Sequence, residues 1–294
     1  MKKKHYGSLQ NKPEKFDIVL LVLLIILAII IIVPFYNALV LSLVSSVEYT
    51  QRKIILWPKE IVLDNYTAIL RHSNLLSGYK NTLLLVAIGV PVELLLTVML
   101  GYCFSRQFIF KKPLFLFVMF SMFFSGGLVP TYLLIRSMKL LNSLWATILI
   151  SGISTYYMII IKGSFEAIPE SLTEAAKIDG ANDMRILFSV MLPLQMPMLA
   201  TFALFFIVNR WNEWYWPMIT LTKANKQVLS VFLRTIVNQA QQISETSAEM
   251  EEVETYSLGV KMASTAVIML PIMVVYPFLQ KYFVKGVMVG SIKM

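Results

Sequence analysis

Residues 174–194 read EAAKIDGANDMRILFSVMLPL and are the most polar stretch of a very apolar neighbourhood. Pro169 suits the first turn of a helix, where a missing N–H costs nothing, so a short polar helix is predicted over 170–179. Gly180 can adopt a positive φ and end that helix. Asn182 can cap a second helix. The stretch is therefore predicted to be a helix–glycine–helix hairpin.

The second helix of this hairpin is expected to be apolar on one face. That face is formed by Met184, Leu187, Phe188 and Met191. Pro193 is expected to open the next apolar segment. The hairpin occupies segment 163–192, is charged at its tip, and is apolar where it rejoins its neighbours. This design favours a compact knob that docks onto a cytoplasmic partner.

The rest of the chain is dominated by long apolar runs. Of its 294 residues 57% are hydrophobic and 15% are charged, and the mean hydropathy is +0.69, whereas soluble domains carry about 25% charged residues. A membrane-spanning helix needs about 20 largely uncharged residues. Six runs meet this requirement: 17–43, 81–104, 113–136, 144–162, 193–216 and 258–283. The predicted fold class is all-α, a polytopic membrane protein with six transmembrane helices.

The N-terminal apolar run is expected to be a retained span rather than a cleaved signal peptide. It extends well past the 7–15 residues of a signal h-region, and no cleavage site follows it. Basic residues precede it, and the positive-inside rule then places both termini in the cytoplasm. The net charge of +9 fits lysines at the ends of membrane spans that face anionic lipid. The basic residues do not cluster on a soluble domain, so nucleic-acid binding is not indicated.

This topology divides the chain into four parts. Residues 1–16 form a cytoplasmic tail, and 17–80 hold the first helix and an outer loop. Residues 81–283 form a five-helix transmembrane domain that contains the hairpin, and 284–294 form a second cytoplasmic tail.

Few residues suit metal or nucleotide chemistry. Cys103 is the one cysteine, and His5 and His72 stand apart in sequence, so neither a disulfide nor a metal site is expected. No glycine-rich phosphate loop with Lys-Ser or Lys-Thr occurs. We therefore expect no metal and no cofactor bound by this chain.

The third apolar run, 113–136, contains the helix breakers Gly126, Gly127 and Pro130. In lipid, backbone groups freed by a break must find partners in protein or in a water-filled cavity. The break is either a kink that allows close helix packing or part of a translocation path, and the two are compatible. It is the one interrupted span that the sequence predicts.

Charged residues inside spans are functional candidates by default. Arg210 lies near the end of the fifth run and Glu93 near the middle of the second, and Glu93 is expected to pair with Arg210 or with another subunit. The candidate substrate-path residues are Asn209, Arg210, Asn212, Glu213, Trp214, Trp216, Glu93, Gly126 and Gly127. The amides and carboxylates offer hydrogen bonds and the indoles offer flat faces to a sugar. An interfacial aromatic belt is the alternative for the Trp-rich end.

The hairpin resembles the EAA loop of binding-protein-dependent ABC importer permeases. The family pattern falls here on Glu174, Ala175, Ala176 and Gly180, followed by Val190 where isoleucine is usual, and by Leu192 and Pro193. Three further stretches resemble the carbohydrate branch related to the maltose permeases: 142-NSLWATIL-149, 211-WNEWYWPM-218 and 276-YPFLQKYFVKGVMVGSIK-293. The FSGGLVPTYLL run and the C-terminal stretch are most similar to the LplC/YtcP lineage.

The resemblance implies a multi-pass subunit of a bacterial cell membrane, without enzymatic activity, in an ATP-driven importer of a sugar or oligosaccharide. The implied partners are a second permease, a cytoplasmic ATPase dimer that holds ATP and Mg²⁺, a lipid-anchored extracytoplasmic solute-binding protein, membrane lipid and the carbohydrate. The implied ATPase-docking residues are Glu174, Ala175, Ala176, Asp179, Gly180, Lys285, Gly286 and Gly290.

Other classes of protein remain as alternatives. A permease of the same machine type could import peptides, amino acids or polyamines. An integral membrane enzyme is disfavoured, because Asp179 and Asp183 supply too few oxygen ligands for a divalent ion. A secondary transporter is disfavoured because such folds show two related halves with matching broken helices.

Overall fold

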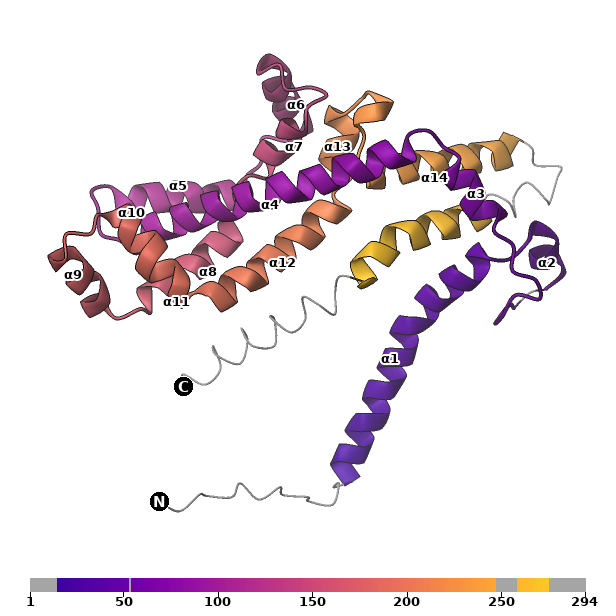
Figure 1. Cartoon of the computed structure of the whole chain (residues 1–294), viewed down its shortest axis with the longest axis horizontal. Coiled ribbons are helices and arrows are strands. Elements are labelled where there is room, and N and C mark those ends of the chain that lie inside the picture. The colour runs from indigo at the N-terminus through magenta and orange to yellow at the C-terminus, as the bar shows by residue number, and fades with distance from the viewer. Residues whose placement is uncertain (1–14, 53, 247–257, 275–294) are drawn as a thin grey trace. The chain divides into compact units, whose positions relative to one another are not determined.

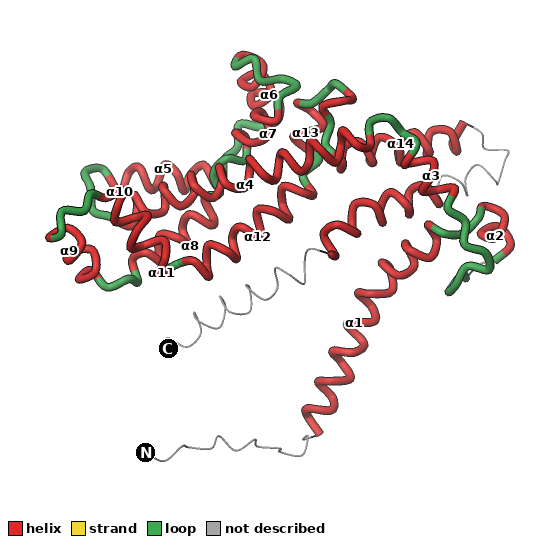
Figure 2. Tube along the Cα trace, in the orientation of Figure 1, coloured by secondary structure: helices red, strands yellow, loops and turns green. Residues whose placement is uncertain are grey.

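The computed structural model describes residues 15–52, 54–246 and 258–274, and every regular element in these ranges is a helix (Figure 1, Figure 2). The chain divides into two compact units. The first holds residues 1–68 and 240–266, and the second holds 69–239 and 267–294.

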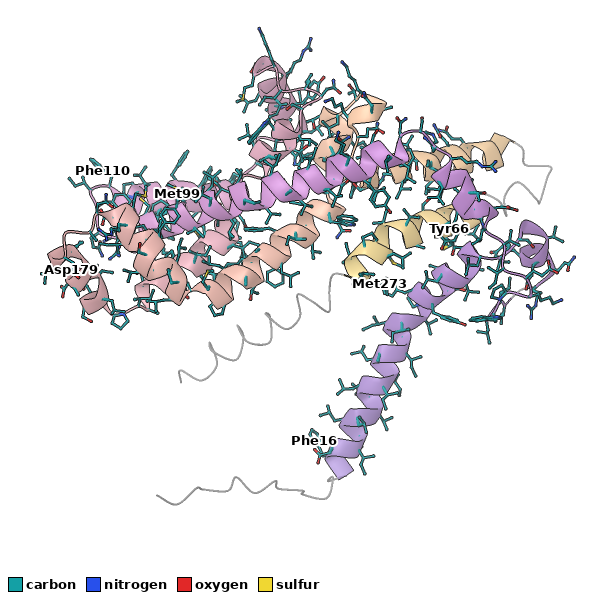
Figure 3. All side chains as sticks on the ribbon, viewed as in Figure 1. Phe16, Tyr66, Met99, Phe110, Asp179 and Met273 are labelled. Carbon is teal, nitrogen blue, oxygen red and sulfur yellow. The ribbon has the colours of Figure 1, made fainter. Side chains whose placement is uncertain are left out.

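The first unit begins with α1 (Lys15–Ser42), whose apolar sequence makes it a membrane span. Two short helices follow, α2 (Ser46–Gln51) and α3 (Asp64–Leu70). The end of α1 is tied to α3, because the Ser42 and Tyr66 hydroxyls lie 2.7 Å apart and the Asn65 amide donates to the Ser42 carbonyl at 3.1 Å. Figure 3 labels Tyr66 at this junction.

The second unit is built on α4 (Leu75–Ser105), which packs against α8 (Thr155–Glu166) and α12 (Met196–Asn212). Small residues let helices approach closely in membranes. At Gly101 of α4 an added Cβ would lie 2.8 Å from Cγ2 of Ile161 on α8. The main core cluster of this unit consists of Val98, Tyr102, Ile161, Phe165, Ile186, Leu187, Met191, Leu199 and Phe202.

The third predicted span is more strongly broken than a kink. It consists of α5 (Lys111–Phe123) and α6 (Leu128–Ser137), whose axes differ by 113°. Gly127 adopts φ +84°, a region that glycine enters without steric cost, and its N–H bonds to Oγ of Ser125 at 3.0 Å. The predicted interruption at Gly126 and Gly127 is confirmed.

The prediction that only this span is interrupted is wrong. The fourth span consists of α7 (Leu144–Ile150) and α8, bent by 56°, and Ser154 caps the start of α8 by accepting from the N–H of Tyr157. A second bend, of 87°, lies between the segment 183–194 and α12, close to the start of the predicted fifth run. Ser151, Gly152 and Ser154 are the local signals that an apolar-run search passed over.

The predicted span boundaries shift accordingly. Helix α4 begins at Leu75 rather than 81, and α12 begins at Met196 rather than at Pro193. In the described ranges α1 and α4 are long and apolar enough to cross a membrane, and the count rises to five if each bent pair is one span. A shorter apolar helix, Leu258–Val274, follows (yellow in Figure 1).

Three further elements complete the second half of the chain. They are α13 (Tyr215–Thr220), the 3₁₀ turn η2 (Ala224–Lys226) and α14 (Leu229–Thr246). The amide of Asn81 on α4 donates to the carbonyls of Asn225 and Gln227 at 3.0 and 2.9 Å. These bonds hold the turn after α13 against α4.

Candidate functional site

A buried arginine lies at the centre of the second unit. Arg210, near the end of α12, is 1% exposed. Its Nε donates to Glu93 of α4 at 3.0 Å, and its Nη1 donates to Glu213, the residue that ends α12, at 2.9 Å. The pairing of Glu93 with Arg210 predicted from the sequence is confirmed. Isolated buried charges are costly, and here each charge has an opposite partner.

The remaining N–H groups of Arg210 donate hydrogen bonds to backbone carbonyls at the break between α7 and α8. Nη1 donates to the carbonyl of Thr147 at 3.2 Å, and Nη2 donates to the carbonyls of Ile148 at 3.4 Å and Ser151 at 2.9 Å. The last carbonyls of a helix have no partner within it, and lipid offers none. All five N–H donors of the guanidinium are therefore used, and the broken fourth span depends on them.

Helix α4 approaches this cluster through a glycine. A Cβ added at Gly89 would lie 3.4 Å from Cγ1 of Ile148 and 3.5 Å from Nε of Arg210. The absence of a side chain at this position leaves room for the guanidinium between α4 and the end of α7.

A pocket of about 330 Å³ opens beside the cluster. This volume is at the lower end of the range for small-ligand sites. Its lining residues are Glu93, Ser151, Asn209, Arg210, Asn212, Glu213, Trp214 and Tyr215. The Ser151 hydroxyl bonds to Glu213 at 3.4 Å, and the guanidinium of Arg234 lies 4.0 Å above the Trp214 ring. The pocket thus combines carboxylates, amides and aromatic faces.

The structure brings together most of the residues predicted for a substrate path. Glu93, Asn209, Arg210, Asn212, Glu213 and Trp214 all line the pocket. Trp216 lies in α13 and is not among the lining residues, and Gly126 and Gly127 lie at the α5–α6 break. Sequence reasoning missed Ser151, because the break that exposes it looked like continuous span.

The hairpin forms as predicted in its first half. Helix α9 (Glu170–Ile178) follows Pro169, and Gly180 takes φ +76° just after it. Helix α10 (Asp183–Ile186) then starts at Asn182, whose side-chain oxygen accepts from the N–H of Arg185 at 2.8 Å. The predicted glycine stop and asparagine cap are both confirmed.

The predicted single apolar face of the second half is wrong. A π-helical turn occupies Leu187–Met191 and leads into α11 (Leu192–Leu194). A π turn adds a residue to the helical repeat, so side chains no longer return to one face at a 3.6-residue period. Leu187 and Met191 are buried in the core cluster, whereas Met184 and Phe188 are about half exposed.

The EAA-like residues lie at one end of the second unit. Glu174, Ala175, Asp179 and Gly180 are exposed, and Ala176 is half-buried against the core cluster. Figure 3 labels Asp179 at this end, and none of these residues lines the pocket. The predicted docking residues Lys285, Gly286 and Gly290 lie outside the described residues. In the described ranges no three His, Cys, Asp or Glu side chains gather as a metal site would require.

A membrane-spanning helical bundle with broken spans beside a pocket that charged, amide and aromatic side chains line, and with an exposed helical hairpin at one end, is typical of the membrane component of a transporter. Residues 66–289 match the family described as "Binding-protein-dependent transport system inner membrane component". The chain belongs to this family. It is a multi-pass, non-catalytic permease component.

Individual relatives agree with this assignment. The chain is 36% identical over 287 residues to the polygalacturonan/rhamnogalacturonan transport system permease protein YtcP of Bacillus subtilis, covering 96% of this chain and 99% of YtcP. It is 34% identical over 279 residues to protein LplC of the same organism, covering 95% of each. The resemblance to the LplC/YtcP lineage is confirmed.

A solved structure shares the fold. It is a chain from the crystal structure of a bacterial ABC transporter involved in the import of the acidic polysaccharide alginate. The TM-score is 0.78 at 29% identity, and the match covers 94% of this chain and 100% of the other.

Proposed function

We propose that the chain is one of two permease subunits that form the membrane path for a sugar or oligosaccharide in an ATP-driven importer. The observation that carries this proposal is the pocket beside Arg210, in a chain whose relatives include a permease for polygalacturonan and a transporter for alginate. Asn209, Asn212 and Glu213 supply hydrogen bonds for sugar hydroxyls, and Trp214 supplies a flat apolar face.

The hairpin is proposed as the docking element for the ATPase. Glu174, Ala175, Asp179 and Gly180 are exposed for contact, while the root of the hairpin is buried in the core of the bundle. A movement of α9 would therefore be passed to the helices as rigid-body switching between two states. ATP and Mg²⁺ belong to the ATPase in this scheme.

Six membrane spans with both termini in the cytoplasm complete the proposed topology. The spans are α1, α4, α5 with α6, α7 with α8, α12, and a final span that begins with the helix Leu258–Val274. The C-terminal residues Lys285, Gly286 and Gly290 would then be free to reach the ATPase. A lipid-anchored solute-binding protein would deliver the sugar from the other side.

Co-purification tests the docking proposal. The tagged chain, extracted from its native membrane, should bring down a second permease, an ATPase and a solute-binding protein. Glu174→Arg should lose the ATPase while retaining the second permease. Lys226→Glu is the control, because it reverses another exposed charge in the second unit, outside the hairpin. Equal recovery of the ATPase with both variants would contradict the proposed role of the hairpin.

A cationic cargo such as a polyamine is the second candidate. Among the described residues that line the pocket, two are carboxylates, Glu93 and Glu213, and one is a cation, Arg210, whose donors are all used. This charge balance favours a positively charged solute. Binding measurements on the co-purified solute-binding protein distinguish the two, since saccharide binding supports the first candidate and polyamine binding the second.

A further inference from the structure

The loop that follows α1 carries an unusual set of exposed apolar side chains. Five of the large apolar residues in segment 54–63 point to the outside: Ile54 (77% exposed), Leu56 (72%), Trp57 (67%), Ile61 (63%) and Leu63 (55%). Scattered exposed apolar residues are normal, but a contiguous exposed group marks an interaction site. The question is which partner covers it.

Internal contacts fix the shape of this segment, so its exposed side chains are not a result of disorder. Ile55 is buried in a small core with Val40 and Val44 of the first unit. The carboxylate of Glu48 accepts from the backbone N–H of Lys59 at 3.1 Å, and the Val62 N–H donates to the Leu43 carbonyl at 2.9 Å. The segment is thus held at both ends while its apolar side chains face outward.

A hydrogen bond sets the depth of the segment along α1. The hydroxyl of Tyr36 donates to the carbonyl of Leu56 at 2.6 Å. Tyr36 precedes the end of α1 at Ser42 by about 9 Å, at 1.5 Å of rise per residue. Side chains on a helix tilt toward its N-terminus. The Tyr36 hydroxyl therefore lies at least as far from the C-terminal end of α1 as the Tyr36 Cα does. The loop therefore folds back along α1.

The sequence of α1 indicates where Tyr36 lies relative to the bilayer. Lys15 and Asp17 stand at the start of α1, and the uncharged run that begins at Ile18 continues to the end of the helix at Ser42. Tyr36 lies about 27 Å along this run, near the far edge of a hydrocarbon core of roughly 30 Å that begins at Ile18. This edge is the boundary between acyl chains and headgroups, where Tyr and Trp concentrate. Leu56 and Trp57 are held at the same boundary, and the exposed apolar surface of α1 continues into theirs.

We propose that segment 54–63 is an interfacial lipid anchor. Leu56, Trp57 and Ile61 lie among headgroups and upper acyl chains beside α1, and Lys59 faces anionic headgroups. The anchor fixes the tilt and depth of α1 through Ile55, and through the bond from the Lys59 N–H to Glu48 it holds α2 as well. This role does not depend on the cargo, on the ATPase, or on which side of the membrane the segment lies.

Site-directed spin labelling tests this placement. In the full chain with Cys103→Ser, nitroxides are placed by Leu56→Cys and Ile61→Cys, both at exposed positions where no internal packing is lost. Ile25→Cys on α1 is the lipid reference and Gln51→Cys on α2 the aqueous reference. Each variant is reconstituted in nanodiscs of phosphatidylcholine and phosphatidylglycerol, and collision rates with oxygen and with a water-soluble nickel chelate are compared.

The anchor predicts an oxygen-to-nickel collision ratio at 56 and 61 that lies above the ratio at 51 and approaches the ratio at 25. A ratio at 56 and 61 equal to that at 51 would overturn the proposal. Labels that report water until a solute-binding protein is added, and are shielded only then, would show a protein-docking surface instead. Gel filtration of each variant checks that the labelled chain is folded.

Discussion

Replacing Arg210 by methionine keeps most of the side-chain volume and removes the charge and all five donors. Glu93 and Glu213 then lose their shared cation, and breaking a buried pair in this way costs about 3–5 kcal/mol. Three carbonyls at the α7–α8 break also lose the Arg210 donor; that of Thr147 keeps a bond from the Ser151 N–H at 3.4 Å, and each of the others that is left unsatisfied adds about 1–3 kcal/mol. We therefore expect a loss of at least about 3–5 kcal/mol.

The expected loss is large enough to measure as a melting shift. About 1 kcal/mol lowers the Tm of a domain of this size by roughly 2–4 °C, so Arg210→Met should melt roughly 10 °C or more below the parent. The assay is gel filtration of the detergent-purified chain after heating. Arg136→Met removes an exposed arginine of α6 and is the matched control. Equal melting of the two variants would refute the reasoning.

A triple variant separates the two sources of this loss. Glu93→Gln and Glu213→Gln, added together to Arg210→Met, remove the uncompensated negative charge but do not restore the Arg210 hydrogen bonds to the carbonyls at the α7–α8 break. Partial recovery of the Tm assigns the recovered part to charge. Arg210→Lys retains the charge with three donors in place of five and a different geometry, so it should fall between the parent and Arg210→Met.

Two further predictions concern helix packing and pH. Gly101→Ala should destabilise the second unit by about 1–3 kcal/mol through overpacking against Ile161, whereas Gly163→Ala, where a Cβ meets nothing within 4 Å, should not lower the Tm. Desolvation raises the pKa of Glu48, but hydrogen bonds from Arg52 and the Lys59 backbone outweigh it and lower the pKa below 4.5. A lowered folded-state pKa gives stability that is present above 4.5 and is lost as pH falls through the folded value. A spin label in α2 should therefore gain mobility in that acidic window, and with Glu48→Gln it should be mobile at neutral pH too.

Local signals in the sequence predicted the hairpin well. Gly180 and Asn182 act on their immediate neighbours through φ and a cap, so a reading of the sequence alone could find the end of one helix and the start of the next. The same reading failed five residues after Asn182, because the π turn at Leu187–Met191 changes the helical repeat without a distinctive residue type. An expected face built on a 3.6-residue period then included Met184 and Phe188, which are exposed.

The break in the fourth span was missed for a different reason. Hydropathy averages over a window, and 144–162 is apolar throughout except for a few small polar residues. The group that makes the break tolerable in lipid is Arg210, which lies about 60 residues further along the chain. A partner at that distance cannot be read from the run itself. The pairing with Glu93 was predictable because both residues are charges inside spans, which must find opposite partners.

The hairpin and the pocket are attached to the same helices, and this has a mechanical consequence. The core cluster joins the root of the hairpin, through Leu187 and Met191, to α4, α8 and α12. Arg210 joins α12 to α4 and to the end of α7. We infer that these helices move as one body, so a push on α9 turns the pocket as a unit. Arg210→Met should loosen this body as well as destabilise it. In the assembled importer the variant should therefore hydrolyse more ATP for each solute moved, and an unchanged ratio would show that the cluster contributes to stability alone.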